Sequence, residues 1–289
     1  MSETGSLQRF RLIDRRSGPG ILVNEDGAGS RVGWGWIIDG ATGVSSGRLT
    51  PGASDAAWLA AQIDQTLHNL APHFCSAEAL MPALESAVAD AFLPFKPPVP
   101  SGDLGPAACL GLVRVHSGPA GLRLSGAFLG DVVGLVPSEE GVVRWTDERA
   151  KPFERRTLAA LASERRLESG EASDVVRRQI RENRQQLNRP NGYWVVQPER
   201  PWAGNELVFE TEIEPGQAVV LATDGFMRLV DVFGAYTDAE LHEALAAGHA
   251  SELMERLRAL ERRDPVAGAY PRVKTHDDAT VLVLAVEEA

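Results

Sequence analysis

Apolar residues recur every three or four positions in several stretches of the chain, which is the spacing of one buried helix face. The clearest stretch follows Ser54-Asp55, which is a typical helix start, and continues to Leu70. Pro94 and the proline-rich segment behind it are expected to end a second helix. Helices are predicted over residues 55–70, 77–92, 153–167, 173–187, 238–247 and 252–262.

Short apolar runs bounded by Gly, Pro and Ser predict β-strands. They cover residues 10–15, 20–26, 32–38, 107–116, 122–129, 132–136, 142–145, 194–196, 207–209, 218–223 and 280–286. Strands cluster toward both ends of the chain, and helices come in pairs between them. This order differs from the strand–helix alternation of a parallel sheet. It indicates an α+β sandwich in which helix pairs cover antiparallel sheets.

Size and charge narrow the class of protein. The 289 residues are 44% hydrophobic, which is enough for a large buried core. The formal net charge of -11 disfavours binding to nucleic acid or to anionic lipid. No apolar run is long enough for a membrane helix, and the first residues lack the apolar core of a secretory signal. The two cysteines, Cys75 and Cys109, have no metal-ligand spacing, which favours a reduced, cytoplasmic setting.

Four aspartates, Asp39, Asp131, Asp224 and Asp277, each lie at the edge of an apolar strand. A carboxylate beside a buried strand is costly to desolvate unless it is paired, and several together repel one another. A hard divalent cation such as Mg²⁺ or Mn²⁺ would resolve both problems, because it prefers oxygen ligands. Each aspartate taken alone is better explained as a turn former or a helix cap, and the shared context of the four favours the metal site.

The chain also carries a series of segments that, in their order and spacing, resemble the motifs of the type 2C metal-dependent serine/threonine phosphatases, the bacterial-type members in particular. The resemblance runs from about residue 20 to the end of the chain. The segments are NEDG (24–27), WIIDGATG (36–43), GPAACLGLVRV (105–115), FLGDVVGLV (128–136), NGYWVV (191–196), AVVLATDGFMRLVD (218–231) and HDDATVLVL (276–284).

The resemblance implies a single domain over residues 1–289, because motifs from both ends must converge. It implies a four-layer α-β-β-α sandwich of two antiparallel sheets flanked by helix pairs. Asp39 would bridge two Mn²⁺ or Mg²⁺ ions, and the Gly40 carbonyl would ligate one of them. Asp224 and Asp277 would complete the other. These three aspartates would carry catalysis through a metal-activated water, with no protein nucleophile.

Other positions follow from the same resemblance. Glu25 and Asp26 would hold water molecules on the metals. Asp131, together with Asp224, matches the position that supports a third and weaker metal ion. The expected substrate is phosphoserine or phosphothreonine in a protein, and the expected partners are a serine/threonine kinase or its targets.

The sequence departs from the family pattern at three positions. Ile21 stands where the family often has a phosphate-binding arginine, and Ala41 where a histidine often follows Asp-Gly. Asp278 replaces the usual asparagine after the last motif aspartate. Arg15, Arg16 and Arg31 are alternative phosphate-binding residues, and the sequence does not choose among them. The departures keep a second hypothesis open, a catalytically impaired signalling module that uses the same fold for binding.

A basic stretch on the two predicted middle helices gives two further interpretations. It would form solvated helix faces paired with nearby glutamates, or it would attract phosphopeptides to the cleft. The residues are Arg155, Arg156, Arg165, Arg166, Arg177, Arg178, Arg181 and Arg184.

Overall fold

The computed structural model of the chain describes residues 9–41, 48–96, 105–119, 121–162 and 174–287. In this part of the chain, the strands form two antiparallel sheets of five strands each. In spatial order, the strands of the first sheet are β1 (Phe10–Gly18), β10 (Ala279–Val286), β9 (Ala218–Ala222), β6 (Val133–Ser138) and β7 (Gly141–Trp145). Those of the second sheet are β2 (Gly27–Arg31), β3 (Trp34–Ala41), β4 (Ala107–Gly118), β5 (Gly121–Leu129) and β8 (Leu207–Glu212).

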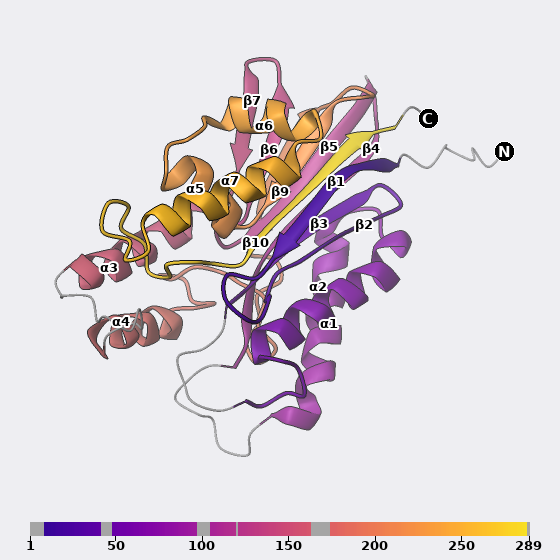
Figure 1. Cartoon of the computed structure of the whole chain (residues 1–289). Helices are drawn as coiled ribbons and strands as arrows, with labels where there is room; N and C mark the ends of the chain where they lie inside the picture. The colour runs from indigo at the N-terminus through magenta and orange to yellow at the C-terminus, as the bar shows by residue number, and fades with distance from the viewer. Residues whose placement is uncertain (1–8, 42–47, 97–104, 120, 163–173, 288–289) are drawn as a thin grey trace.

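Helices cover the outer face of each sheet, as Figure 1 shows. Two long helices, α1 (Asp55–Leu70) and α2 (Ala77–Phe92), form the layer outside the second sheet, where α1 contacts β2, β3 and β4. The first sheet is covered by α5 (Asp224–Asp231), α6 (Asp238–Ala246) and α7 (Ala250–Arg263), which contact β10, β7, β9 and β1. The order of layers is therefore helix, sheet, sheet, helix. The predicted α+β four-layer sandwich is confirmed.

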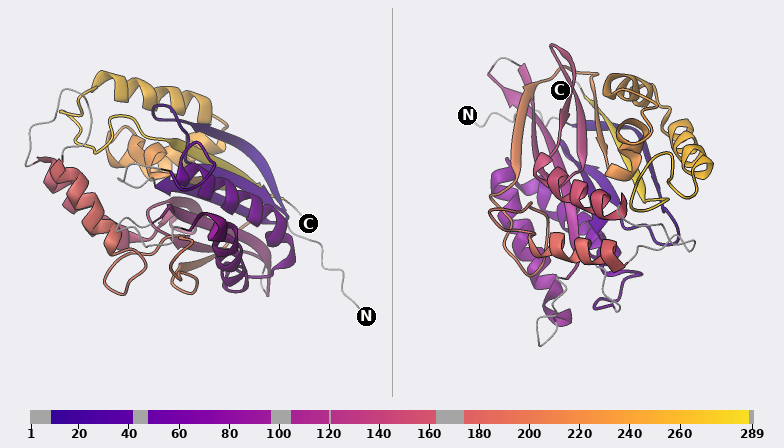
Figure 2. Two further views of the ribbon diagram at one scale, coloured as in Figure 1. Left: turned by 90° about the horizontal axis from the view of Figure 1, so that it is seen from below. Right: turned by 90° about the vertical axis from the view of Figure 1, so that its left-hand side faces the viewer.

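The remaining two helices, α3 (Lys151–Ala162) and α4 (Asp174–Gln185), pack against each other. They lie beside one end of the sheets, outside both helix layers (Figures 1 and 2). No helix in the described ranges combines the length and apolarity needed to cross a membrane.

Side-chain alternation explains why the central strands are apolar on both faces. Along β3, Trp36 and Ile38 pack on the helix side, whereas Ile37 packs between the two sheets. Along β10, Val283 faces the α5–α7 layer and Leu284 faces the space between the sheets. Three apolar layers result, and they fix the relative positions of the strand ends that carry the acidic residues.

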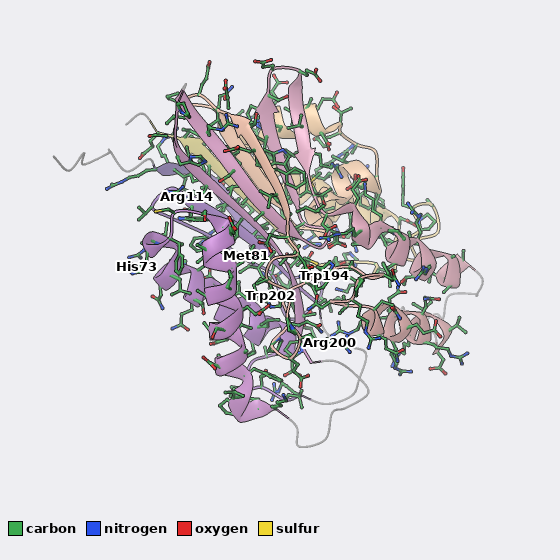
Figure 3. The ribbon with its side chains drawn as sticks, turned by 180° about the vertical axis from the view of Figure 1, so that it is seen from behind. His73, Met81, Arg114, Trp194, Arg200 and Trp202 are labelled. Atoms are coloured by element: carbon green, nitrogen blue, oxygen red, sulfur yellow. The ribbon has the colours of Figure 1, made fainter. Side chains whose placement is uncertain are left out.

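A loop that follows α4 closes the side of the α1–α2 layer. Trp202 is fully buried in the same cluster as Met81 of α2, and Figure 3 shows both side chains there. The backbone N–H groups of Trp202 and Ala203 donate to the Glu85 carboxylate. Val196 forms a single bridge with Ala108, so the predicted strand over residues 194–196 is only an isolated bridge.

Two further expectations about elements differ from the structure. Residues 20–26 form no strand: Ile21 is 75% exposed and Leu22 is 89% exposed, so the apolar run does not face the core. The sequence also did not predict α5, which begins directly after β9 at Asp224. The predicted helix over 153–167 is observed up to Ala162, and its last residues lie outside the described ranges, as does residue 173 of the next predicted helix.

Candidate metal centre

Asp39 lies near the end of β3, an inner strand of the second sheet, opposite Cys109 of β4. Burial raises the pKa of the Asp39 carboxyl well above its ordinary value, and the charges of Asp224, Asp26, Asp131 and Asp277 raise it further. The adjacent Gly40 is packed so closely on the backbone of Glu25 that a Cβ atom there would collide with the Glu25 carbonyl oxygen. The glycine therefore lets two segments of the candidate site meet.

Asp224 is the first residue of α5 and follows Thr223, the N-cap residue. Asp224 is exposed as a whole residue. The surrounding protein nevertheless desolvates its carboxyl, and this desolvation together with the charges of Asp277 and Asp131 raises the pKa to about 6. A hydrogen bond joins the Asp224 and Asp39 carboxyl groups. Neighbouring carboxyl groups of this kind favour a shared proton or a cation, because two bare negative charges repel.

Asp277 and Asp278 lie in the segment that leads into β10. The Asp277 carboxylate accepts hydrogen bonds from Arg228 Nη2 at 2.6 Å and from Lys274 Nζ at 2.7 Å. The Asp278 carboxylate accepts from the backbone N–H of Gly20 at 2.7 Å and of Glu25 at 2.9 Å. Asp278 thus fastens the 20–25 segment to the site, which gives this departure from the family pattern a structural role.

Asp26 precedes β2 and lies next to Thr223, the N-cap residue of α5, and Thr280 of β10. Thr223 Oγ1 donates to Asp26 Oδ2 at 3.0 Å. Burial raises the pKa of Asp26 to about 7, although the hydroxyls of Thr280 and Thr223 act in the opposite direction. The charges of Asp278 and Asp224 also raise it. Asp26 therefore belongs to the same cluster of negative charge as Asp39.

Asp131 lies between β5 and β6, where Cys109 Sγ donates to its carboxylate at 3.2 Å. Burial raises the pKa of Asp131, and the charges of Glu154 and Asp277 contribute in the same direction. Cys109 is buried, and its thiol contacts the acidic cluster through Asp131.

Glu154 of α3 was not predicted. Burial and the charge of Asp224 raise the pKa of its carboxyl, and its charge in turn raises the pKa of Asp131, so a residue outside the four layers adds to the negative charge of the cluster. Nothing local in the sequence indicates this contribution, because it depends on where α3 docks.

The structure brings together all five predicted aspartates, and Gly40 packs against Glu25 beside them. Their hard oxygen atoms suit Mg²⁺ or Mn²⁺. As the side chains stand, the described residues include no group of three or more His, Cys, Asp or Glu side chains that could hold a metal ion. The aspartates instead pair with Arg228, Lys274, Thr223 and one another. The chemistry of these oxygen donors fits a hard divalent cation, and metal ligation stays a prediction.

At two of the positions that depart from the family pattern, the side chain can neither bind phosphate nor donate a proton. Ile21 points to solvent, and Ala41 ends β3. Arg15 donates to the Ala28 carbonyl and Arg16 to Ser251 Oγ, so both have partners other than the acidic cluster.

The basic stretch is not uniformly solvated. Arg184 is buried, and it donates to the carbonyl oxygens of Gly105 at 2.9 Å and Ala41 at 3.4 Å. This arginine ties α4 to the strand end that carries Asp39. Arg165 and Arg166 lie outside the described residues.

No family model matches the sequence, and no curated protein matches it. The fold is nevertheless that of the type 2C serine/threonine phosphatases, because solved phosphatases of this type align with nearly the whole chain. The catalytic domain of PstP in complex with two manganese ions aligns with a TM-score of 0.55 and 16% identity, over 97% of this chain and 99% of that one.

Two other solved structures show the same similarity. The Mycobacterium tuberculosis phosphatase PstP/Ppp gives a TM-score of 0.53 at 16% identity, covering 97% of this chain and 99% of that chain. PppA, described as a key regulatory component of the T6SS in Pseudomonas aeruginosa, gives 0.51 at 16% identity with the same coverage. At this identity the similarity establishes the fold.

Proposed function

We propose that this protein hydrolyses phosphate monoesters, with phosphoserine or phosphothreonine in proteins as substrate and with Mn²⁺ or Mg²⁺ as cofactor. The observation that carries the proposal is the convergence of Asp39, Asp224 and Asp277. They come from three distant segments of a chain with a phosphatase fold, and the charges of Asp224 and Asp277 both act on the Asp39 carboxyl. A cluster of this kind is costly to maintain unless it binds a cation.

The proposed roles of the side chains in catalysis differ. Asp39, Asp224 and Asp277 would hold two cations, with the Gly40 carbonyl as a further ligand, and Asp131 would contribute to a third site. When bound, the cations would activate a water molecule for in-line attack and stabilise charge on the phosphate oxygens. Glu25 and Asp26 would accept hydrogen bonds from water in the site. Thr223, which donates to Asp26, orients that carboxyl.

The proton for the leaving group must come from solvent or from another acid, because Ala41 has no group to donate it. We further expect a cytoplasmic location and a serine/threonine kinase or its targets as partners. The net charge of -11 disfavours nucleic acid as a partner.

The test is the hydrolysis of p-nitrophenyl phosphate and of a phosphothreonine peptide with Mn²⁺. Removing a residue that only hydrogen-bonds a metal ligand costs roughly 10–100-fold in activity. Asp39→Asn changes a ligand itself, so kcat/KM should fall by more than this. A chelator should abolish the wild-type rate. Asp90→Asn, at an exposed position on α2, is the matched control and should retain full activity. Activity that survives Asp39→Asn or the chelator would refute the proposal.

One observation favours the alternative of a binding module. Both oxygens of Asp277 already have cationic partners, Arg228 and Lys274, and the phosphate-binding arginine is replaced by the exposed Ile21. A folded protein that neither turns over a phosphoester nor binds Mn²⁺ would support the module.

A further inference from the structure

The two cations that contact Asp277 differ in how firmly they are held. Arg228 is 7% exposed, and its Nη1 donates at 3.0 Å to Glu261, whose side chain is fully buried. Arg258 binds the other oxygen of Glu261 at 2.8 Å and also donates to the Asp277 carbonyl. The Arg228 guanidinium is thus locked between two carboxylates, and it cannot leave without stranding a buried charge.

Lys274 is held much less firmly. Its side chain is 57% exposed, and its ammonium forms an ion pair at 2.7 Å with Asp277, three residues along the chain. An exposed ion pair of this kind contributes little to the free energy of unfolding, because water stabilises the free ammonium almost as well as the carboxylate partner does. Because its side chain is exposed, the Lys274 ammonium can move into solvent, and what opposes this movement is the attraction of the acidic cluster.

The oxygen that Lys274 occupies is also the more crowded one. Asp277 Oδ1 accepts from Lys274 Nζ and from the Asp278 backbone N–H, whereas Oδ2 accepts from Arg228. The negative charges of Asp39 and Asp224 act on the Lys274 ammonium as well as that of Asp277. The ammonium and a divalent cation are therefore attracted to the same place by the same carboxylates.

We propose that Lys274 is a displaceable counter-ion of Asp277, and that a divalent cation entering the site must expel its ammonium, so that Lys274 weakens metal binding. This inference rests on the proposed metal-dependent function. In the exchange, an ion pair breaks and a metal–carboxylate bond forms, and Lys274 keeps its proton and moves to solvent. Arg228 stays on Oδ2 throughout.

The test measures Mn²⁺ affinity by titration calorimetry, without any substrate. Lys274→Gln removes the competing charge and should lower the Kd for Mn²⁺ by about two- to fivefold, the range set by an exposed charge pair. Lys274→Arg keeps the charge and should stay within about twofold of wild type. Lys96→Gln, at an exposed position just after α2, is the matched control and should not change the Kd.

A second measurement follows the lysine itself. Acylation by an amine-reactive reagent, quantified by mass spectrometry, should modify Lys274 faster when Mn²⁺ is present, while the labelling of Lys96 stays constant. A structural role for Lys274 alone would not produce this metal-dependent change.

The outcomes separate this inference from the proposed function. Equal Kd values for the wild type and Lys274→Gln, or Lys274 labelling that ignores Mn²⁺, would overturn the displacement and leave the phosphatase proposal standing. If neither protein binds Mn²⁺, both proposals are wrong.

Discussion

Asp26 illustrates how a single buried carboxyl links the candidate site to the stability of the protein. Its pKa is raised from 3.8 to about 7, chiefly by burial. Between these two values, the folded protein keeps a proton that the unfolded chain has released. The free energy of unfolding therefore falls as pH rises, because the unfolded state binds fewer protons.

We accordingly expect the metal-free protein to be more stable at pH 5 than at pH 8. The contribution of Asp26 is fully present below about pH 4 and is lost as the pH rises through about 7, and it amounts to about 2–4 kcal/mol. Denaturant titrations with a chelator at the two pH values would measure it. Asp26→Asn should make the pH dependence shallower without abolishing it, because the raised pKa of Asp224, about 6, acts in the same direction, whereas Asp90→Asn should leave it unchanged. Parallel pH profiles for the wild type and Asp26→Asn would contradict the expectation.

At the scale of elements, the β2–β3 hairpin has a backbone conformation that does not suit its sequence. Arg31 pairs with Trp34, which leaves a two-residue loop of Val32 and Gly33 with φ values of 45° and 77°. Such a loop favours Asn-Gly, because both residues need positive φ. A β-branched residue there is strained, since its side chain crowds the backbone.

Val32→Asn should therefore raise the free energy of unfolding by about 1 kcal/mol, the scale of the left-handed penalty for an ordinary residue. Val32 is 38% exposed, so little apolar burial is lost. Thermal or denaturant unfolding would measure the gain. Val32→Thr keeps the branched side chain and should give no gain, and a stabilisation of equal size in both variants would assign the effect to something other than φ.

Some elements could be predicted from the sequence because their pattern is local. The helices α1 and α2 have apolar residues at helical spacing and serine N-caps, Ser54 and Ser76. The helix α5 has only eight residues and begins with Asp-Gly, which locally favours a turn. Gly225 is required because a Cβ atom there would collide with the Asp278 carbonyl oxygen, a contact between segments far apart in the chain.

The 20–26 segment shows the opposite error. Ile21, Leu22 and Val23 form an apolar run that predicts a strand, but the segment has no strand partner among the described residues. It is held by Asp278, which binds the backbone N–H groups at both of its ends. Contacts between distant segments leave no local pattern in the sequence. The sequence could therefore indicate the aspartates, but not the positions of Arg228, Lys274 and Glu154 relative to them.

At the scale of the whole molecule, the single domain over residues 1–289 remains a prediction. The apolar core between the two sheets supports it, because that core contains residues from β3 and β4 as well as β9 and β10. We expect one cooperative unfolding transition, with tryptophan fluorescence and far-UV circular dichroism changing at the same denaturant concentration. Tryptophans occur both in the α1–α2 layer and, at Trp145, between the sheets. Two separate transitions would contradict the prediction.

The pairing of β1 with β10 has a consequence for how the protein is made. Leu12 pairs with Leu284, about 270 positions later, so the ribosome must work for roughly 15–50 s before β1 meets this neighbour. Asp277, just before β10, emerges almost as late. During synthesis, the acidic site therefore stays incomplete until the segment with Asp277 and β10 has been translated.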